Sequence, residues 1–167
     1  GNFIYLAKGG IMEKYTKILD AKPENHTINI LADLLSGKDG ELGAIMQYFY
    51  QIAMTSDKEL KRLLEEIDRD EMMHARLLAD AIVQFGGIPY LCNQYNKFFT
   101  TEYLDYAMNE REFLITDIRD EEKAIKSYEK AIEMVDNESL KTLFSEIMED
   151  EKMHLKKLRE QLERFDK

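Results

Sequence analysis

Apolar residues recur every three or four positions along most of the chain, which is the period of an amphipathic α-helix. The pattern is clearest in the last segment, from the turn at Asp136-Asn137 to near Phe165, and it repeats in an earlier segment over 57–85. The two apolar stripes consist of Leu140, Leu143, Ile147, Glu151, His154, Leu158 and Leu162, and of Leu60, Leu63, Ile67, Glu71, His74, Leu78 and Ile82. Each stripe therefore carries a glutamate and a histidine on the face that should be buried.

The remaining periodic segments predict two more helices. One covers about 27–54, begins near Thr27 as a candidate cap, and is interrupted over 36–40, where two glycines indicate a kink or a break. The other covers about 101–135. Residues 1–26 lack a long period, so they predict an irregular arm with one short helical stretch at 11–20.

The lengths of the connections predict the topology. The turns at Ser56-Asp57 and Asp136-Asn137 are short, so each joins two neighbouring helices into an antiparallel hairpin. The connection over 86–100 follows Gly86-Gly87 and is much longer; at ~3.3 Å per extended residue it spans roughly 50 Å, enough to return along a helix of about 30 residues. We therefore expect an all-α four-helix bundle of two antiparallel hairpins joined by a long crossover.

The chain contains an internal repeat. When residues 41–80 are placed on 121–160 without gaps, 16 of 40 positions are identical. The identities include polar positions inside the apolar stripes as well as apolar ones. In each half a glutamate is followed 30 residues later by Glu-x-x-His: Glu41 precedes Glu71-Met72-Met73-His74, and Glu121 precedes Glu151-Lys152-Met153-His154.

The repeated glutamates and histidines predict a dinuclear metal site. An ionised glutamate buried in a helix bundle costs several kcal/mol unless it is paired or binds a metal ion. Carboxylate and imidazole ligands without thiolate suit iron or manganese. Glu122 is an alternative to Glu121 as a metal ligand, but only Glu121 is in register with Glu41 in the repeat. We predict one half-site of Glu41, Glu71 and His74 and another of Glu121, Glu151 and His154, with Glu71 and Glu151 as bridges.

Two further repeated pairs are candidates for supporting roles. Asp70 and Asp150 precede the bridging glutamates, and each could accept the second N–H of the histidine in the opposite hairpin. Their alternative role is a charge on the helix surface. Tyr48 and Tyr128 lie two turns beyond the first glutamates and are the candidate catalytic residues, which could donate a hydrogen bond or an electron; a buried structural tyrosine is the alternative.

The length, charge and cysteine content of the chain limit the number of domains and exclude some classes of function. A chain of 167 residues predicts one domain, with an N-terminal arm over 1–26 and the bundle over 27–167. The net charge of −10 argues against nucleic-acid binding. Cys92 is the single cysteine, so no intrachain disulfide can form. We find no signal peptide or membrane span in the pattern and expect a cytoplasmic protein.

These motifs resemble the di-iron carboxylate proteins of the ferritin-like superfamily, among which bacterioferritins and rubrerythrins are most similar. The resemblance rests on Glu41 with Tyr48, Asp70-Glu71-Met72-Met73-His74-Ala75, Glu121, and Asp150-Glu151-x-x-His154. It implies two iron ions that cycle between ferrous and ferric states with dioxygen or peroxide. The run Gly40-Glu41-Leu42 with Gln47-Tyr48 also resembles small manganese catalases, so manganese stays open.

The chain departs from these relatives in three ways. Bacterioferritins have a fifth helix that helps to close a cage, whereas 13 residues follow His154 here, so we expect a homodimer. Ile118 stands where rubrerythrins carry an extra glutamate, and no cysteine pairs are present, so an external electron donor is expected. Met72 occupies the place of the haem-ligating methionine, but methionine is a common core filler and we do not expect haem.

The sequence therefore predicts an oxidoreductase with a dinuclear, di-iron centre that reacts with peroxide or dioxygen, of the rubrerythrin or ferroxidase type. Two alternatives remain at this point. One is disproportionation of peroxide as in manganese catalases, and the other is non-enzymatic binding or storage of iron.

Overall fold

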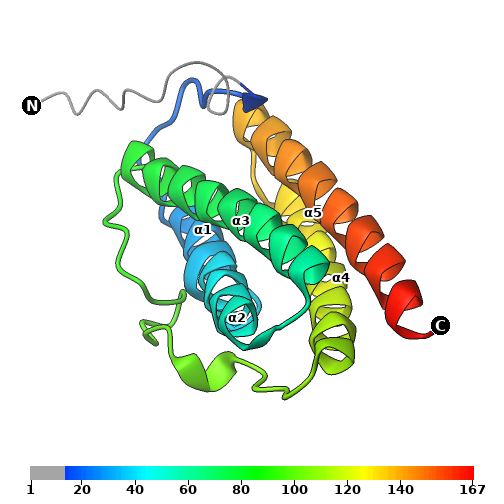
Figure 1. Ribbon diagram of the computed structural model, residues 1–167. Coiled ribbons are helices and arrows are strands. Elements are labelled where there is room, and N and C mark those ends of the chain that lie inside the picture. Colours follow the sequence, from blue (N-terminus) through cyan, green and yellow to red (C-terminus); the bar gives the residue numbers. More distant parts are fainter. Residues whose placement is uncertain (1–13) are drawn as a thin grey trace, which may run out of the picture.

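A computed structural model describes residues 14–167 of the chain, which form a bundle of long helices (Figure 1). No strand occurs within 14–167, where an isolated bridge joins Cys92 to Phe98. The elements are α1 (Asn25–Ser36), α2 (Glu41–Met54), α3 (Lys58–Gln84), the short 3-10 helix η2 (Thr101–Tyr103), α4 (Glu110–Met134) and α5 (Glu138–Phe165). The predicted all-α class is confirmed.

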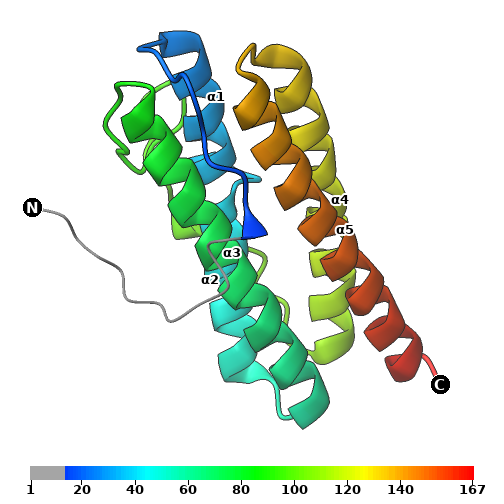
Figure 2. The ribbon, with the colours of Figure 1, turned by 90° about the horizontal axis from the view of Figure 1, so that it is seen from above.

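The bundle consists of two hairpins, as expected. Helices α1 and α2 follow one another along one edge and together take the place of a single helix, which pairs with α3, while α4 pairs with α5 (Figure 2). The hairpin turns are fixed by capping: the Asp57 side chain accepts from Leu60 N–H, and Asn137 accepts from Leu140 N–H. The chain then crosses between the hairpins along the side of α2 (Figure 1).

The core is divided into two apolar clusters. One contains Leu78, Ile82 and Leu140, and the other contains Leu64 and Leu158. The predicted stripes are buried, with two exceptions. Leu63 is partly buried while its neighbour Leu64 is fully buried, and Leu162 near the end of α5 is partly buried. The polar residues of both stripes lie between the two clusters along α3 and α5, so a polar layer divides the apolar core.

The crossover is longer than predicted. It runs over 85–109, because α4 begins at Glu110 rather than near Thr101. Asn109 caps α4 by accepting from Glu112 N–H. The Gln47 side chain binds both the N–H and the C=O of Asp105, and these backbone groups are therefore not available to a helix. The glycine signal at the start of the crossover is correct, since Gly86 has φ +85°.

The structure settles three expectations about the first 40 residues. The interruption at 36–40 is a true break between α1 and α2. Thr27 is not a cap, because α1 already begins at Asn25. The short helical stretch expected at 11–20 is not found in its described part, 14–20, which forms no α-helix; residues 11–13 lie outside the described residues.

Candidate metal centre

The structure brings all six predicted ligands into one buried layer. Each of the four bundle positions contributes: Glu41 from α2, Glu121 from α4, and a Glu-x-x-His pair from each of α3 and α5. Two groups of donor atoms, each within 4.8 Å of one another, consist of Glu41, Glu71, His74 and Glu151, and of Glu71, Glu121, Glu151 and His154. Glu71 and Glu151 belong to both groups, which is the geometry expected of bridging ligands.

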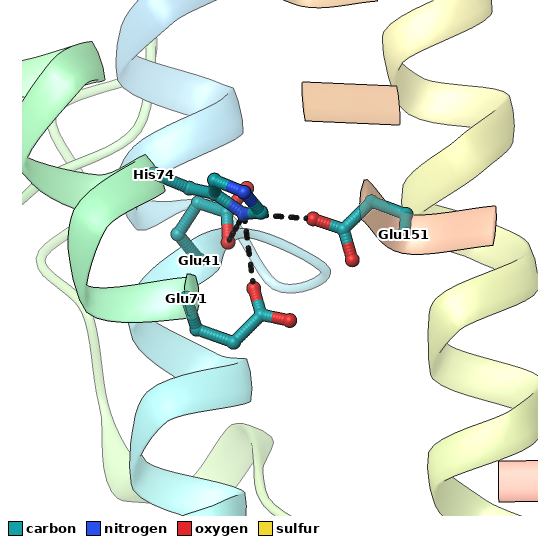
Figure 3. A group of neighbouring side chains, drawn as sticks. All are labelled: Glu41, Glu71, His74 and Glu151. Carbon is teal, nitrogen blue, oxygen red and sulfur yellow. Dashed lines mark ion pairs between the residues drawn. The ribbon is translucent and has the colours of Figure 1, made fainter. Parts of the chain in front are cut away.

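The two histidines present their Nδ1 atoms to the carboxylates. Nδ1 of His74 lies 3.0 Å from Oε1 of Glu151 and 3.6 Å from Oε2 of Glu71 (Figure 3). Nδ1 of His154 lies 3.0 Å from Oε1 of Glu71. Each histidine therefore reaches a glutamate of the opposite hairpin. Glu122, the competing residue, lies nearer the surface, 2.6 Å from Arg159.

Several buried atoms of this layer form no hydrogen bond of normal geometry within the protein, even where a histidine nitrogen lies 3.0 Å from a carboxylate oxygen. They are Nδ1 of His74 and His154, Oε1 of Glu71 and Glu151, and Oε2 of Glu121. Buried polar atoms are normally satisfied, so their concentration in one layer indicates a ligand that accepts lone pairs. The donors are oxygen and imidazole nitrogen without sulfur, and this set fits two ions of iron or manganese.

Without metal the layer balances its own charge through protons. Burial and the neighbouring carboxylates Glu71 and Glu151 raise the pKa of Glu41 and of Glu121 well above the ordinary value. Burial alone would lower the pKa of His74, but contacts with four carboxylates outweigh it and raise the pKa well above 6.5; the same holds for His154. These four groups thus hold their protons more strongly than a free glutamate or histidine does, whereas the pKa values of Glu71 and Glu151 are lowered by hydrogen bonds from their neighbours.

Metal binding at pH 7 is therefore expected to release protons from these four groups. Affinity then increases with pH. The stability of the metal-free protein changes with pH in the opposite direction, because its folded state binds more protons than its unfolded state. Its melting temperature should therefore fall as pH rises from 5 to 8. Calorimetric titration in buffers of different ionisation heat measures the proton count; a value near zero would contradict this protonation state.

The predicted outer contacts are confirmed. Nε2 of His74 lies 3.1 Å from Oδ2 of Asp150, and Nε2 of His154 lies 3.0 Å from Oδ2 of Asp70, so each aspartate serves the histidine of the opposite hairpin. These bonds leave Nδ1 of each ring to face the carboxylates.

The two tyrosines also reach across the bundle. The Tyr48 hydroxyl donates to Oε1 of Glu121, and the Tyr128 hydroxyl donates to Oε1 of Glu41. Burial and the nearby carboxylates raise the pKa of both phenols, so each remains a donor. The predicted hydrogen bonds are present, while a catalytic role for these tyrosines stays a prediction.

A cavity of about 530 Å³ leads from the surface to one side of the layer. It lies between α2, α4 and the crossover, and its lining includes Glu41, Glu71, Glu121 and Glu151 together with both tyrosines. The opposite side of the layer, between α3 and α5, is covered by the described part of the N-terminal arm, which begins at residue 14 (Figure 2). Molecules can therefore approach the centre from the α2–α4 side.

A family model described as a ferritin-like domain matches residues 18–167. The chain belongs to the ferritin-like family. None of the helices of this ferritin-like chain within 14–167 combines the length and the apolar character needed to cross a membrane.

Individual relatives of this ferritin-like chain fall into two groups. A bacterioferritin from Brucella melitensis is 33% identical over 129 residues, which cover 74% of this chain and 76% of that protein. A probable manganese catalase from Clostridium acetobutylicum is 24% identical over 154 residues, covering 80% of this chain and 68% of that protein. The structure of KatB, a manganese catalase from Anabaena PCC7120, superposes with a TM-score of 0.87 at 19% identity, covering 95% of this chain and 81% of that one, and shows the shared fold.

Met72 is 47% exposed on α3, so it is not the core filler that its residue type suggested. Its neighbour Met73 is the one packed against the apolar core of this ferritin-like bundle.

The ferritin-like centre has one contributor that the sequence does not predict, Tyr15. Its buried hydroxyl donates to Oδ2 of Asp150 at 2.7 Å, and its ring stands edge-on to His74 with centroids 6.1 Å apart. Lys14 pairs with the other oxygen of Asp150. Burial raises the pKa of Asp150, but bonds from His74, Lys14 and Tyr15 outweigh it and lower the pKa to about 2.

The two aspartates that contact the histidines are repeated in the sequence but differ in their surroundings. The Asp150 side chain is 13% exposed beneath the arm, whereas the equivalent Asp70 is 43% exposed. Tyr15 lies outside the repeated segments, and no repeat or period in the sequence marks it.

Asp150→Asn is expected to weaken metal affinity by about 10–100-fold, because it removes the carboxylate that orients His74. Asp70→Asn should have a smaller effect, since solvent can reach that site and replace the lost contact. Calorimetric titration of both variants with Mn²⁺ tests the difference, and equal losses would contradict the asymmetry.

Proposed function

We propose that the chain is a dinuclear-metal oxidoreductase, with iron as the natural metal, that reduces peroxide or dioxygen. The observation that carries the proposal is the buried layer of four glutamates and two histidines with a cavity leading to one side of it. A layer built only for stability would not need an approach route. The bacterioferritin relative supports iron.

The residues of such a centre would have different roles. Glu71 and Glu151 would hold both ions, and the two histidines and the outer glutamates would hold one ion each. Asp70, Asp150 and the two tyrosines fix the ligands through hydrogen bonds and so reduce their rearrangement during a redox change. When bound, two divalent ions supply two electrons, which reduce H₂O₂ and two protons to two water molecules.

The stoichiometry of the reaction tests the proposal. Protein loaded with two Fe²⁺ per chain without oxygen is mixed with H₂O₂, and iron oxidation is followed by absorbance. We expect one peroxide consumed for two iron ions and no oxygen evolved. Iron that stays ferrous while peroxide persists would contradict the proposal.

Disproportionation of peroxide by a manganese centre is the second candidate, and the manganese catalase relative favours it. It predicts that Mn²⁺-loaded protein evolves one oxygen molecule for two peroxides without any reductant. Storage is the third, and it predicts an iron content far above two ions per chain. An oxygen electrode and iron analysis separate the three.

The proposal includes an external electron donor and a two-fold dimer. The donor would return two electrons to the centre after each peroxide. Support for a dimer comes from large apolar side chains exposed on α2 and the crossover, among them Phe49, Tyr95 and Phe98. Light scattering should give a mass near two chains, and a shell of about two dozen subunits would overturn the dimer.

A further inference from the structure

The cavity beside the carboxylate layer is much larger than peroxide requires. Its volume is about 530 Å³, while a water molecule occupies roughly 30 Å³ of liquid. Cavities of roughly 300–1,000 Å³ are the usual size for sites that bind small organic molecules. The difference in size points to a substrate with an organic body.

Small residues keep the cavity open. On α2 these are Gly43 and Ala44, and on α4 they are Ala124 and Ser127. Ala44 and Ala124 occupy equivalent positions of the repeat, three residues beyond Glu41 and Glu121. A larger side chain at either position would project from the same helix as a predicted ligand and fill the space in front of the layer.

The roof and one end of the cavity are anchored. The Gln47 side chain holds Asp105 of the crossover through two hydrogen bonds, which fixes the roof. Gln51 and Asp117, which lines the cavity, are joined by a bond of 2.7 Å from Nε2 to Oδ1. Oδ2 of Asp117 and Oε1 of Gln51 are buried without a partner. This end therefore retains hydrogen-bonding capacity next to the carboxylate layer.

The charges at the mouth favour a neutral ligand. Lys123 lies 3.4 Å from Asp39, and Arg119 lies 3.7 Å from Asp105 and 3.2 Å from Asp120. These cations are neutralised within the wall. Outside the metal layer and the buried aspartate, the lining carries three cations (Lys38, Arg119, Lys123) and four anions (Asp39, Glu102, Asp105, Asp120). An anionic ligand would meet no surplus of positive charge there.

We propose that the cavity between α2, α4 and the crossover binds neutral organic hydroperoxides, with the peroxide group at the carboxylate layer and the organic body against Ala44, Ala124 and the crossover. The inference rests on the proposed function. The O–O bond breaks as R–OOH, two electrons and two protons give R–OH and water. Two ions held by the carboxylate layer would supply the two electrons, the two protons would come from solvent, and the external donor would return the electrons.

Turnover by the metal-loaded protein tests the substrate class. We expect consumption of cumene hydroperoxide as well as H₂O₂. Ala44→Leu should lower the ratio of the kcat/KM values for cumene hydroperoxide and H₂O₂ by at least tenfold, because the leucine occupies the space of the organic body. Ala124→Leu repeats the test from the opposite wall. Ala53→Leu makes the same change at an exposed position of α2 outside the cavity, and should leave the ratio at its wild-type value.

A binding measurement that does not depend on turnover completes the test. 2-Phenyl-2-propanol, the alcohol product, is titrated into protein with ¹³C-labelled alanine methyl groups and Zn²⁺ at the centre. We expect the methyl signals of Ala44 and Ala124 to shift and that of Ala53 to stay in place. The Ala124 signal should no longer shift in Ala44→Leu, and the Ala44 signal should no longer shift in Ala124→Leu.

The outcomes separate the two proposals. Consumption of H₂O₂ with no consumption of cumene hydroperoxide and no methyl shifts would overturn the cavity assignment and leave the proposed function standing. Failure with both peroxides at full metal content would overturn the proposed function and the hydroperoxide assignment with it. An equal loss of ratio in Ala53→Leu would show that the effect does not arise in the cavity.

Discussion

Mn²⁺ added to the metal-free protein should raise its melting temperature by about 10–20 °C. At a free metal concentration 100 times the dissociation constant, each site contributes about 2.7 kcal/mol to the free energy of unfolding. Two sites give about 5 kcal/mol, and a chain of this size gains roughly 2–4 °C per kcal/mol. The physical source is the replacement of protons by cations among four buried carboxylates and two buried histidines.

Thermal unfolding followed by circular dichroism, with Mn²⁺ and with a chelator, measures this shift. The temperature should increase with the logarithm of free metal concentration. An identical transition under both conditions would mean that the layer is a structural charge cluster.

Glu71→Gln should reduce peroxide-dependent turnover by more than about 100-fold, because the loss of a bridging carboxylate exceeds the 10–100-fold effect of outer contacts. Metal content should fall below two ions per chain. The amide has the shape of the carboxyl group, so the helical circular dichroism signal should persist.

Glu66→Gln is the matched control on α3. Its side chain is 50% exposed and 2.5 Å from Lys157, outside the layer. Wild-type turnover in Glu66→Gln with loss in Glu71→Gln would assign the effect to the centre. Full activity in Glu71→Gln would remove this residue from the set of ligands.

The six-residue layer was predictable because its signals are local and repeated. A glutamate and a histidine three residues apart lie on one helix face, and the apolar stripe shows that this face is buried. The repeat then selected Glu121 over Glu122. The cross-hairpin contacts of Asp70 and Asp150 followed from the same symmetry and are present.

The features that were missed depend on contacts distant in sequence. The start of α4 moved because Gln47, 58 residues away, binds the backbone of Asp105. Docking of Tyr15 on Asp150 spans 135 residues and has no periodic signal. Periodicity identifies faces of helices, but it does not identify which loop or arm will cover a face once the helices have packed.

We expect the four glutamates and two histidines to bind two metal ions side by side. Anomalous X-ray diffraction at the manganese or iron edge, on crystals grown with that metal, locates the ions. There should be two peaks in each chain about 3.5–4 Å apart, both within bonding distance of Glu71 and Glu151. A single peak, or peaks on the acidic surface with the layer free of metal, would contradict it.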